Sequence, residues 1–284
     1  MPAYFNRFLG RYTNTANPVN GTGIGTVVTS GGSIDAQGTA VELISGANAS
    51  ADIWEVCVSV YRGNTSGADS SLLLELLIDP AGGTSYSTWI PEYPVGNADG
   101  ANSPGLQMWF PRFAPAGSSI AARTRGLVAS TTCEVRIEAF MKPTRPEMLL
   151  RGTYAEQIGT RTNSRGVTIG TIGVTGSEGT WVSLGTTAKA LHWIGLAVNF
   201  HDSVIQSGFH WFDLAYGDAT NKNIIAQNIP LHGSTTEILY RQLIPDDFHF
   251  CHIPASTNIY VRGSTHLASA DVCNALAVGI GGGY

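Results

Sequence analysis

The chain has 284 residues and a mass of 30.0 kDa; 13% of its residues are charged, 43% are hydrophobic, and its net charge is −5. This length accommodates two domains of ordinary size, and the composition excludes a disordered chain. The acidic balance excludes the basic surface that nucleic-acid binding requires, and no apolar run reaches the roughly 20 residues of a membrane span, so we expect neither partner.

Residues 1–20 form an N-terminal arm with basic and aromatic residues and no acidic residue. Arg7 and Arg11 interrupt its only apolar run, so we expect no signal peptide there. Residues 21–140 and 167–284 each carry a net negative charge, so we expect the basic arm to dock on a neighbouring subunit. The alternative is a frayed terminus. Its candidate assembly contacts are Tyr4, Phe5, Arg7, Phe8, Arg11 and Tyr12.

Residues 21–140 are predicted to form a first β-sandwich. In "EVRIEAF", Val135, Ile137 and Ala139 alternate with charged residues, and "WEVCVSVY" around Val58 also alternates. Because successive side chains of a strand point to opposite faces, this period of two indicates half-buried antiparallel strands. Turn sequences such as "DPAGG" separate the strands, and we expect about eight strands, the number in a jelly roll.

Residues 141–166 are predicted to be a linker, because two prolines at its start end the last strand of the first sandwich. We expect it to hold at most a short helix. Apolar residues such as Leu149 make it less polar than a free tether, so we expect it to pack against another part of the protein. Its candidate assembly contacts are Arg151 and Tyr154.

Residues 167–284 repeat the first unit. The phrase "APAGSSIAARTRG", which begins at Ala114, returns as "IPASTNIYVRG", which begins at Ile253, with Ser256 in place of Gly117. Matches shifted by 138 to 141 residues run through both units, among them Val41 with Val182, Trp54 with Trp193, Glu75 with Asp213 and Cys133 with Cys273. The predicted fold is all-β: two tandem jelly-roll-like antiparallel β-sandwich domains related by internal duplication.

Charged residues recur at two positions of this repeat. Arg123 and Arg262 occupy one of them, and Glu75 and Asp213 the other. Each arginine is expected to point outward, either paired with an acid or solvated; we favour solvation, because surface ion pairs contribute only about 0–1 kcal/mol. Paired carboxylates also hydrolyse glycosides, but these two fall in different domains, so duplication explains them better than catalysis.

The motifs of common enzymes are absent from the sequence. It has no G-x-S-x-G elbow, no P-loop and no Rossmann fingerprint, so we expect neither an enzyme nor a cofactor. His249, Cys251 and His252 are possible zinc ligands, but in a strand His252 points away from the other two, and we expect no metal site. The four cysteines lack C-x-x-C spacing and are expected to be buried free thiols in a reducing compartment.

Aromatic residues beside predicted loops offer an alternative role in sugar binding. Trp89, Tyr93 and Trp211 are the candidate glycan contacts. Core and interface positions also favour tryptophan and tyrosine, and we expect these positions to account for most of the aromatic residues.

The repeated P-A-G-x-x-I-x-x-R phrase and the C-terminal strand "ALAVGIGGGY" resemble structural proteins of tailed bacteriophages and phage-like particles. The resemblance covers about residues 21–140 and 167–280 and implies a non-enzymatic virion protein made in the host bacterial cytoplasm. It implies a capsid decoration or head-spike protein, or a tail or baseplate component, that contacts copies of itself and other virion proteins. The alternatives are a glycan-recognising, receptor-binding tail or fibre module and, less favoured, an enzyme acting on polysaccharide.

Overall fold

The fold consists of β-strands joined by turns and loops. The computed structural model describes the backbone of residues 11–13 and residues 25–61, 72–95, 106–126, 128–141, 151–159, 166–169, 177–199, 208–233, 248–266 and 273–282. These residues contain eighteen strands and no helix, so none of them belongs to a helix that could cross a membrane.

The first sandwich consists of two antiparallel sheets. In one sheet, β1 (Arg11–Thr13) and β2 (Thr26–Thr29) both pair with the same side of β9 (Thr132–Phe140). The other side of β9 pairs with β4 (Glu55–Tyr61), and β4 pairs with β7 (Leu106–Phe110). In the other sheet the order is β3 (Val41–Ile44), β8 (Ser119–Gly126), β5 (Leu72–Asp79) and β6 (Ser87–Val95). This is the strand arrangement of an eight-stranded jelly roll whose first strand is divided in two.

The second sandwich repeats this arrangement strand for strand. One sheet has β10 (Tyr154–Ile158) and β11 (Val167–Ile169), both on β18 (Cys273–Gly281), followed by β13 (Leu191–Asn199) and β16 (His249–Ile253). The other sheet has β12 (Val182–Thr186), β17 (Asn258–Thr265), β14 (Gly208–Gly217) and β15 (Lys222–Gly233). The predicted all-β fold of two tandem jelly-roll-like sandwiches is therefore confirmed.

Two segments outside the predicted sandwiches form strands. Residues 154–158 lie in the predicted linker, where at most a short helix was expected; they form β10 instead, and all five pair with β18. Residues 11–13 of the predicted arm form β1, in which Arg11 pairs with Phe140. The helix expectation was wrong because "YAEQI" gains its backbone hydrogen bonds from a strand that follows it by more than a hundred residues.

The alternating pattern in the sequence corresponds to the two faces of each sheet. Val135, Ile137 and Ala139 of β9 are fully buried in the core of the first sandwich, whereas Glu134 and Arg136 are only partly buried on the opposite face. The period-two prediction is therefore confirmed for this strand.

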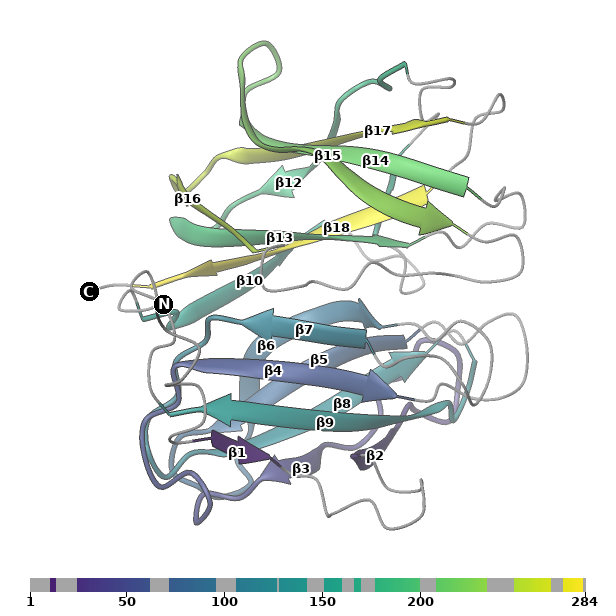
Figure 1. The fold of residues 1–284 in the computed structure, drawn as a ribbon. Coiled ribbons are helices and arrows are strands. Elements are labelled where there is room, and N and C mark those ends of the chain that lie inside the picture. The colour runs from purple at the N-terminus through teal and green to yellow at the C-terminus, as the bar shows by residue number, and fades with distance from the viewer. Residues whose placement is uncertain are drawn as a thin grey trace, which may run out of the picture.

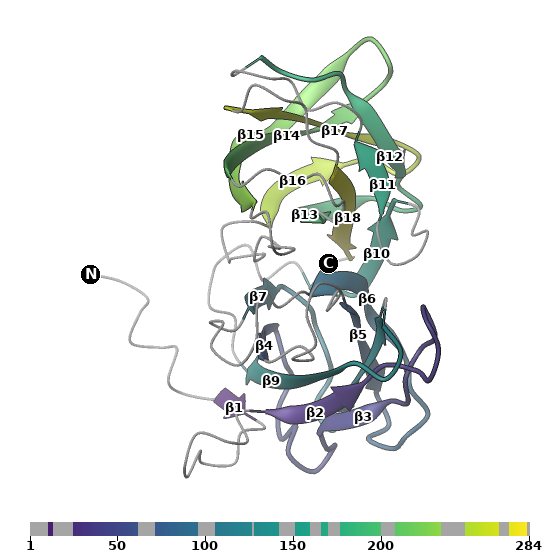
Figure 2. The same cartoon turned by 90° about the vertical axis from the view of Figure 1, so that its right-hand side faces the viewer.

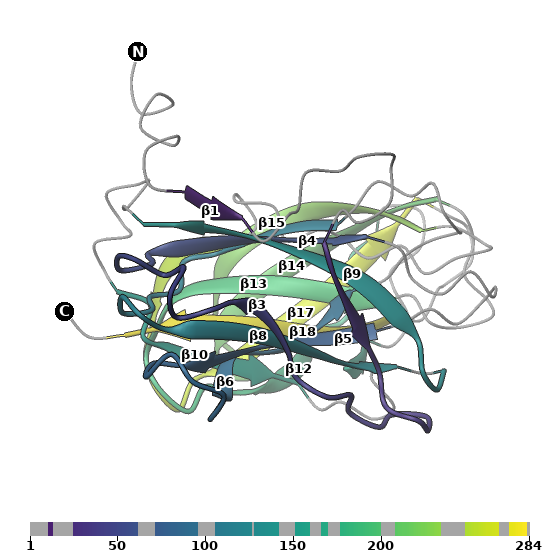
Figure 3. The same cartoon turned by 90° about the horizontal axis from the view of Figure 1, so that it is seen from below.

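The two sandwiches lie one above the other, with most strands running in a similar direction (Figures 1 and 3). The edge of the first sandwich formed by β6 and β7 meets the outer face of the sheet that contains β10, β18 and β13 (Figure 2). Alternate residues of β18 consequently belong to two cores. Ala275 and Ala277 face the second sandwich's own core, and Leu276, Val278 and Ile280 join the core of the first.

The repeated turn keeps its backbone conformation despite the change from glycine to serine. Gly117 has a φ of 83° and Ser256 a φ of 60°, both in the left-handed region. A residue with a side chain is strained in this region by about 1–2 kcal/mol, and a change to glycine relieves the strain. Glycine also gives the unfolded chain more conformational entropy, which cancels about half of that stabilisation.

We therefore expect Ser256→Gly to raise the free energy of unfolding by about 0.5–1 kcal/mol. Gly117→Ser should lower it by a similar amount, because no atom lies within 4 Å of a Cβ placed at Gly117, so backbone strain alone decides the cost. Urea denaturation measures both changes. Opposite signs support the explanation, and a destabilised Ser256→Gly variant contradicts it.

Candidate functional site

The repeated arginines pair with the repeated acids, one pair in each sandwich. Arg123 of β8 stands opposite Glu75 of β5, with 2.6 Å between Nε and Oε2. Arg262 of β17 stands opposite Asp213 of β14, with 2.8 Å between Nε and Oδ2. The preference for solvated arginines was therefore wrong, because the strand register places each acid directly across from its arginine.

Both acids also bind the neighbouring edge strand where it bulges. Two residues of β6 lie opposite Glu75, and two of β15 lie opposite Asp213. Glu75 Oε1 accepts a hydrogen bond from Thr88 Oγ1 at 2.5 Å, and Asp213 Oδ1 accepts one from the backbone N–H of Asn228 at 2.8 Å. Each carboxylate therefore links three strands within its own domain.

Arg262 has two further contacts within the described residues, for which none is found at Arg123 in the same part of the chain. It forms an ion pair with Glu178, and its guanidinium carbon lies 4.5 Å from the ring centroid of Trp181. The side chain of Arg262 is only 17% exposed, against 32% for Arg123, so the second sandwich holds this arginine more completely.

The junction between the sandwiches contains a buried arginine. Arg112 is 4% exposed; its Nε donates to the carbonyl of Trp89 at 2.9 Å, and its Nη1 donates to the carbonyl of Gly152 at 2.5 Å. Burial lowers the pKa of Arg112 to about 9, and no carboxylate in the described part of the chain forms an ion pair with it. The guanidinium thus joins β6 to the segment that enters the second sandwich.

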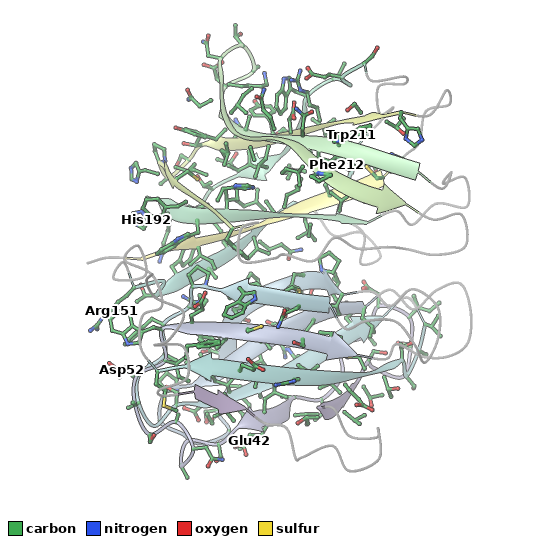
Figure 4. The ribbon with its side chains drawn as sticks, in the orientation of Figure 1. Glu42, Asp52, Arg151, His192, Trp211 and Phe212 are labelled. Atoms are coloured by element: carbon green, nitrogen blue, oxygen red, sulfur yellow. The ribbon has the colours of Figure 1, made fainter. Side chains whose placement is uncertain are left out.

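The two candidate assembly contacts in the predicted linker make contacts within the chain. The guanidinium carbon of Arg151 lies 5.2 Å from the ring centroid of Trp54 and 4.6 Å from that of Phe113 (Figure 4). The hydroxyl of Tyr154 donates to Glu156 at 2.9 Å; burial and this bond raise the pKa of Tyr154 to about 12. The prediction that this segment packs against another part of the protein is confirmed for residues 151–159, whereas Leu149 lies outside the described residues.

Apolar side chains fill the rest of the junction. Trp193 and Ala197 of β13 lie in the same buried cluster as the core of the first sandwich. The rings of Phe110 and Phe248, one from each sandwich, approach edge-on with centroids 5.5 Å apart. The outer face of one sheet of the second sandwich is therefore continuous with the core of the first sandwich, while the second sandwich keeps a separate core of its own.

The three candidate glycan contacts do not share a surface. Trp89 is 2% exposed and its indole N–H donates to the carbonyl of Phe113 at 3.0 Å, and Tyr93 has no exposed area. Both belong to the buried core of the first sandwich and offer no face to a sugar. Trp211 is half-buried on β14 in the other sandwich, 6.3 Å from the ring of His266 (Figure 4).

Comparisons with known proteins find only distant structural similarities. No protein-family model and no curated protein sequence matches the chain. Among solved structures, a chain of Sulfolobus Turreted Icosahedral Virus has 9% identity and a TM-score of 0.39, covering 95% of this chain and 90% of its own. The VP2 subviral particle of infectious bursal disease virus has 15% identity and a TM-score of 0.26, covering 96% of this chain and 71% of its own.

A third solved structure with distant similarity is the tandem CBM22 domain of Xyn10C from Paenibacillus barcinonensis. It has 10% identity and a TM-score of 0.29, and the match covers 96% of this chain and 92% of that one. These likenesses are too distant to assign a function.

The possible zinc ligands lie on β16, as expected for a strand. His249 and Cys251 are half-buried, and Cys251 Sγ donates to the carbonyl of His249 at 3.6 Å. His252 is exposed, with its ring centroid 5.7 Å from that of His192. No group of three or more potential metal ligands occurs among the residues that the structure describes.

The arm residues are described only in part. Tyr4, Phe5, Arg7 and Phe8 lie outside the described residues, and the backbone of Arg11 and Tyr12 belongs to β1. The docking of the arm on a neighbour stays a prediction for all six residues.

All four cysteines are free thiols, and three of them are buried. Burial raises the pKa of Cys57 and Cys133 to about 12, with a smaller contribution from Glu138 for Cys57 and from Glu134 for Cys133. Burial also raises the pKa of half-buried Cys251 to about 11.

We expect the folded protein to resist alkylation at pH 8. Because the thiolate is the reactive form, a pKa raised from 9.0 to about 11 slows Cys251 about 100-fold, and the buried thiols react still more slowly. Mass spectrometry after iodoacetamide treatment, with and without denaturant, measures the labelling. Four labels in denaturant and almost none without it are expected; rapid labelling of Cys57 or Cys133 in the folded protein contradicts their burial.

Proposed function

We propose that this protein is a non-enzymatic structural subunit of a virus particle, of the tailed-phage kind that its repeated phrase implies. It serves as a capsid decoration or head-spike protein, or as a tail or baseplate component. It is made in the host bacterial cytoplasm and assembles with copies of itself and with other virion proteins.

The observation that carries this proposal is that two duplicated sandwiches are joined through the core of the first, which includes side chains from the outer face of the second. Arg112 and the ring pair of Phe110 and Phe248 join the two sandwiches. The repeated pairs at Glu75 and Asp213 fix the edge strands of each sandwich. A rigid subunit with two similar domains suits an assembly, since it offers its neighbours two related sets of surfaces.

The test is the mass of the purified protein in solution, measured by light scattering for the full chain and for a variant that lacks residues 1–10. This truncation leaves β1 in place, because that strand begins at Arg11. We expect a defined oligomer for the full chain and a smaller species for the truncated chain. A monomer in both samples overturns the proposal that the chain assembles through its arm.

A further inference from the structure

The second sandwich has an outer sheet face that differs from its counterpart in the first. This face belongs to the sheet of β12, β17, β14 and β15, at the end of the molecule away from the first sandwich (Figure 1). Phe212 of β14 and Val261 of β17 belong to the second core. Because side chains alternate along a strand, their neighbours Trp211, Asp213 and Arg262 point outward.

Two tryptophans on this face replace small or aliphatic residues of the first sandwich. The repeat aligns "GTAVEL" with "GTWVSL", so Trp181 stands where the first sandwich has Ala40. It also aligns "LLEL" with "WFDL", so Trp211 stands where β5 has Leu73. Both sandwiches keep the arginine and acid pair on this face. The scaffold of the face is therefore common to both sandwiches, and the tryptophans distinguish the second.

A further exchange leaves Trp211 accessible. In the first sandwich Arg125 stands opposite Leu73, and Leu73 is only 1% exposed. In the second sandwich the residue opposite Trp211 is Ser264, which matches Arg125 in the repeat. Serine is too short to cover an indole ring, and Trp211 is partly exposed. The second sandwich thus exposes an aromatic ring where the first buries an aliphatic side chain.

A network of ion pairs fixes the surroundings of the other tryptophan. The guanidinium carbon of Arg262 lies 4.5 Å from the ring centroid of Trp181, and Arg262 forms ion pairs with Asp213 and Glu178. Trp181 is partly exposed, and the side chain of Glu178 is 50% exposed. Groups that are already held in place lose little conformational freedom when a ligand binds, which favours affinity.

The two rings are placed to contact separate parts of one extended ligand. Trp211 lies on β14 and Trp181 directly precedes β12, and β17 runs between these two strands. Because neighbouring strands are about 4.8 Å apart, the backbones that carry the two rings are about 10 Å apart. Arg262 lies on the strand between them. Exposed rings with fixed polar groups between them suit a chain of sugar units, which presents both apolar C–H faces and hydroxyl groups.

The charges of this face favour an uncharged ligand. Arg262 is paired with two carboxylates, so its charge is balanced within the face. A protein partner fits less well, because the centres of protein interfaces are depleted in charged residues. Here the centre is a set of ion pairs, and Ile224 is the one large apolar side chain that the described part of this sheet exposes.

We propose that this outer face of the second sandwich is a binding site for an uncharged glycan chain. The rings of Trp181 and Trp211 pack against the apolar faces of two sugar units, and the side chains of Arg262 and Glu178 bind sugar hydroxyl groups. The site adds a function to the proposed structural role and does not depend on it.

The experiment measures the binding of the full chain to cellohexaose, xylohexaose, mannohexaose and maltohexaose by isothermal titration calorimetry, with hexagalacturonic acid as the acidic comparison. We expect the wild type to bind at least one uncharged oligosaccharide, and to bind it more tightly than the acidic one. Trp181→Ala and Trp211→Leu introduce the residues that the first sandwich has at these positions. Each should weaken binding at least about tenfold, because a stacked ring is lost.

The control is Trp54→Leu. Trp54 is also partly exposed and also stacks with an arginine, Arg151, but it lies in the first sandwich. Circular dichroism establishes that all three variants fold, and light scattering compares their mass with that of the wild type. We expect the control to bind sugar as tightly as the wild type, and all three variants to keep the mass of the wild type.

The outcomes separate the glycan site from the assembly role. A wild type that binds none of the uncharged sugars overturns the site, as does equal weakening in Trp54→Leu or unchanged binding in both other variants. If Trp181→Ala or Trp211→Leu lowers the mass in solution and leaves sugar binding intact, the face is a protein contact and the glycan site is overturned. A monomeric wild type that binds sugar through these rings supports the site and overturns only the assembly role.

Discussion

Replacing Phe110 with alanine is expected to lower the free energy of unfolding by about 3–5 kcal/mol. Phe110 has no exposed area, and its ring lies 4.9 Å from that of Tyr93 and 5.5 Å from that of Phe248. The loss combines the transfer of a large apolar side chain with the cavity left behind. Because the ring contacts both sandwiches, we expect the whole chain to unfold in one transition at a lower urea concentration.

The measurement is urea denaturation followed by tryptophan fluorescence, since Trp89 lies in the first sandwich and Trp193 and Trp211 lie in the second. Ile34→Ala is the control, because Ile34 is 67% exposed and its removal should cost less than about 0.5 kcal/mol. Two separate transitions, with only one shifted by Phe110→Ala, contradict the joining of the two sandwiches through the buried cluster around Phe110.

Replacing Arg112 with methionine is expected to lower the free energy of unfolding by about 2–4 kcal/mol. Methionine has no donor, so the carbonyls of Trp89 and Gly152 are left without their hydrogen bonds in a buried place. Burial of the guanidinium charge is itself unfavourable, as the lowered pKa of Arg112 indicates. Removing this charge therefore offsets part of the stability that the lost hydrogen bonds cost. Urea denaturation measures the balance.

Two companion variants identify the cause. Arg112→Lys keeps the charge but replaces the planar guanidinium with one ammonium group, so we expect an intermediate stability. Arg151→Met removes an exposed arginine that stacks on Trp54 and Phe113, and it should cost less than about 1 kcal/mol. If Arg112→Met is as stable as the wild type, the guanidinium does not hold the junction.

Much of the fold could be predicted because its signals are local or repeated. The alternation around Ile137 marks a strand from neighbouring residues alone. The shifted matches, such as Cys133 with Cys273, predict that both halves share one fold without reference to any contact. Strand β10 was missed because "YAEQI" has no clear alternation, and its four less buried residues are stabilised by pairing with β18.

The candidate site was harder to predict because its contacts depend on distant segments. Glu75 and Arg123 are 48 positions apart, and only the register of β5 on β8 places them together. Trp89 and Tyr93 were expected beside loops, yet both lie on β6 and are buried in the core of the first sandwich. Arg112 was missed altogether, since the repeat has no arginine at its counterpart.

The first strand is divided at the same place in both halves. In each half the first strand stops and resumes on the same partner, β1 and β2 on β9, and β10 and β11 on β18. Two independent insertions at the same place in two halves are a less economical explanation than one insertion in a common ancestor. One interruption inherited by both halves through duplication is therefore the simpler explanation of the shared feature.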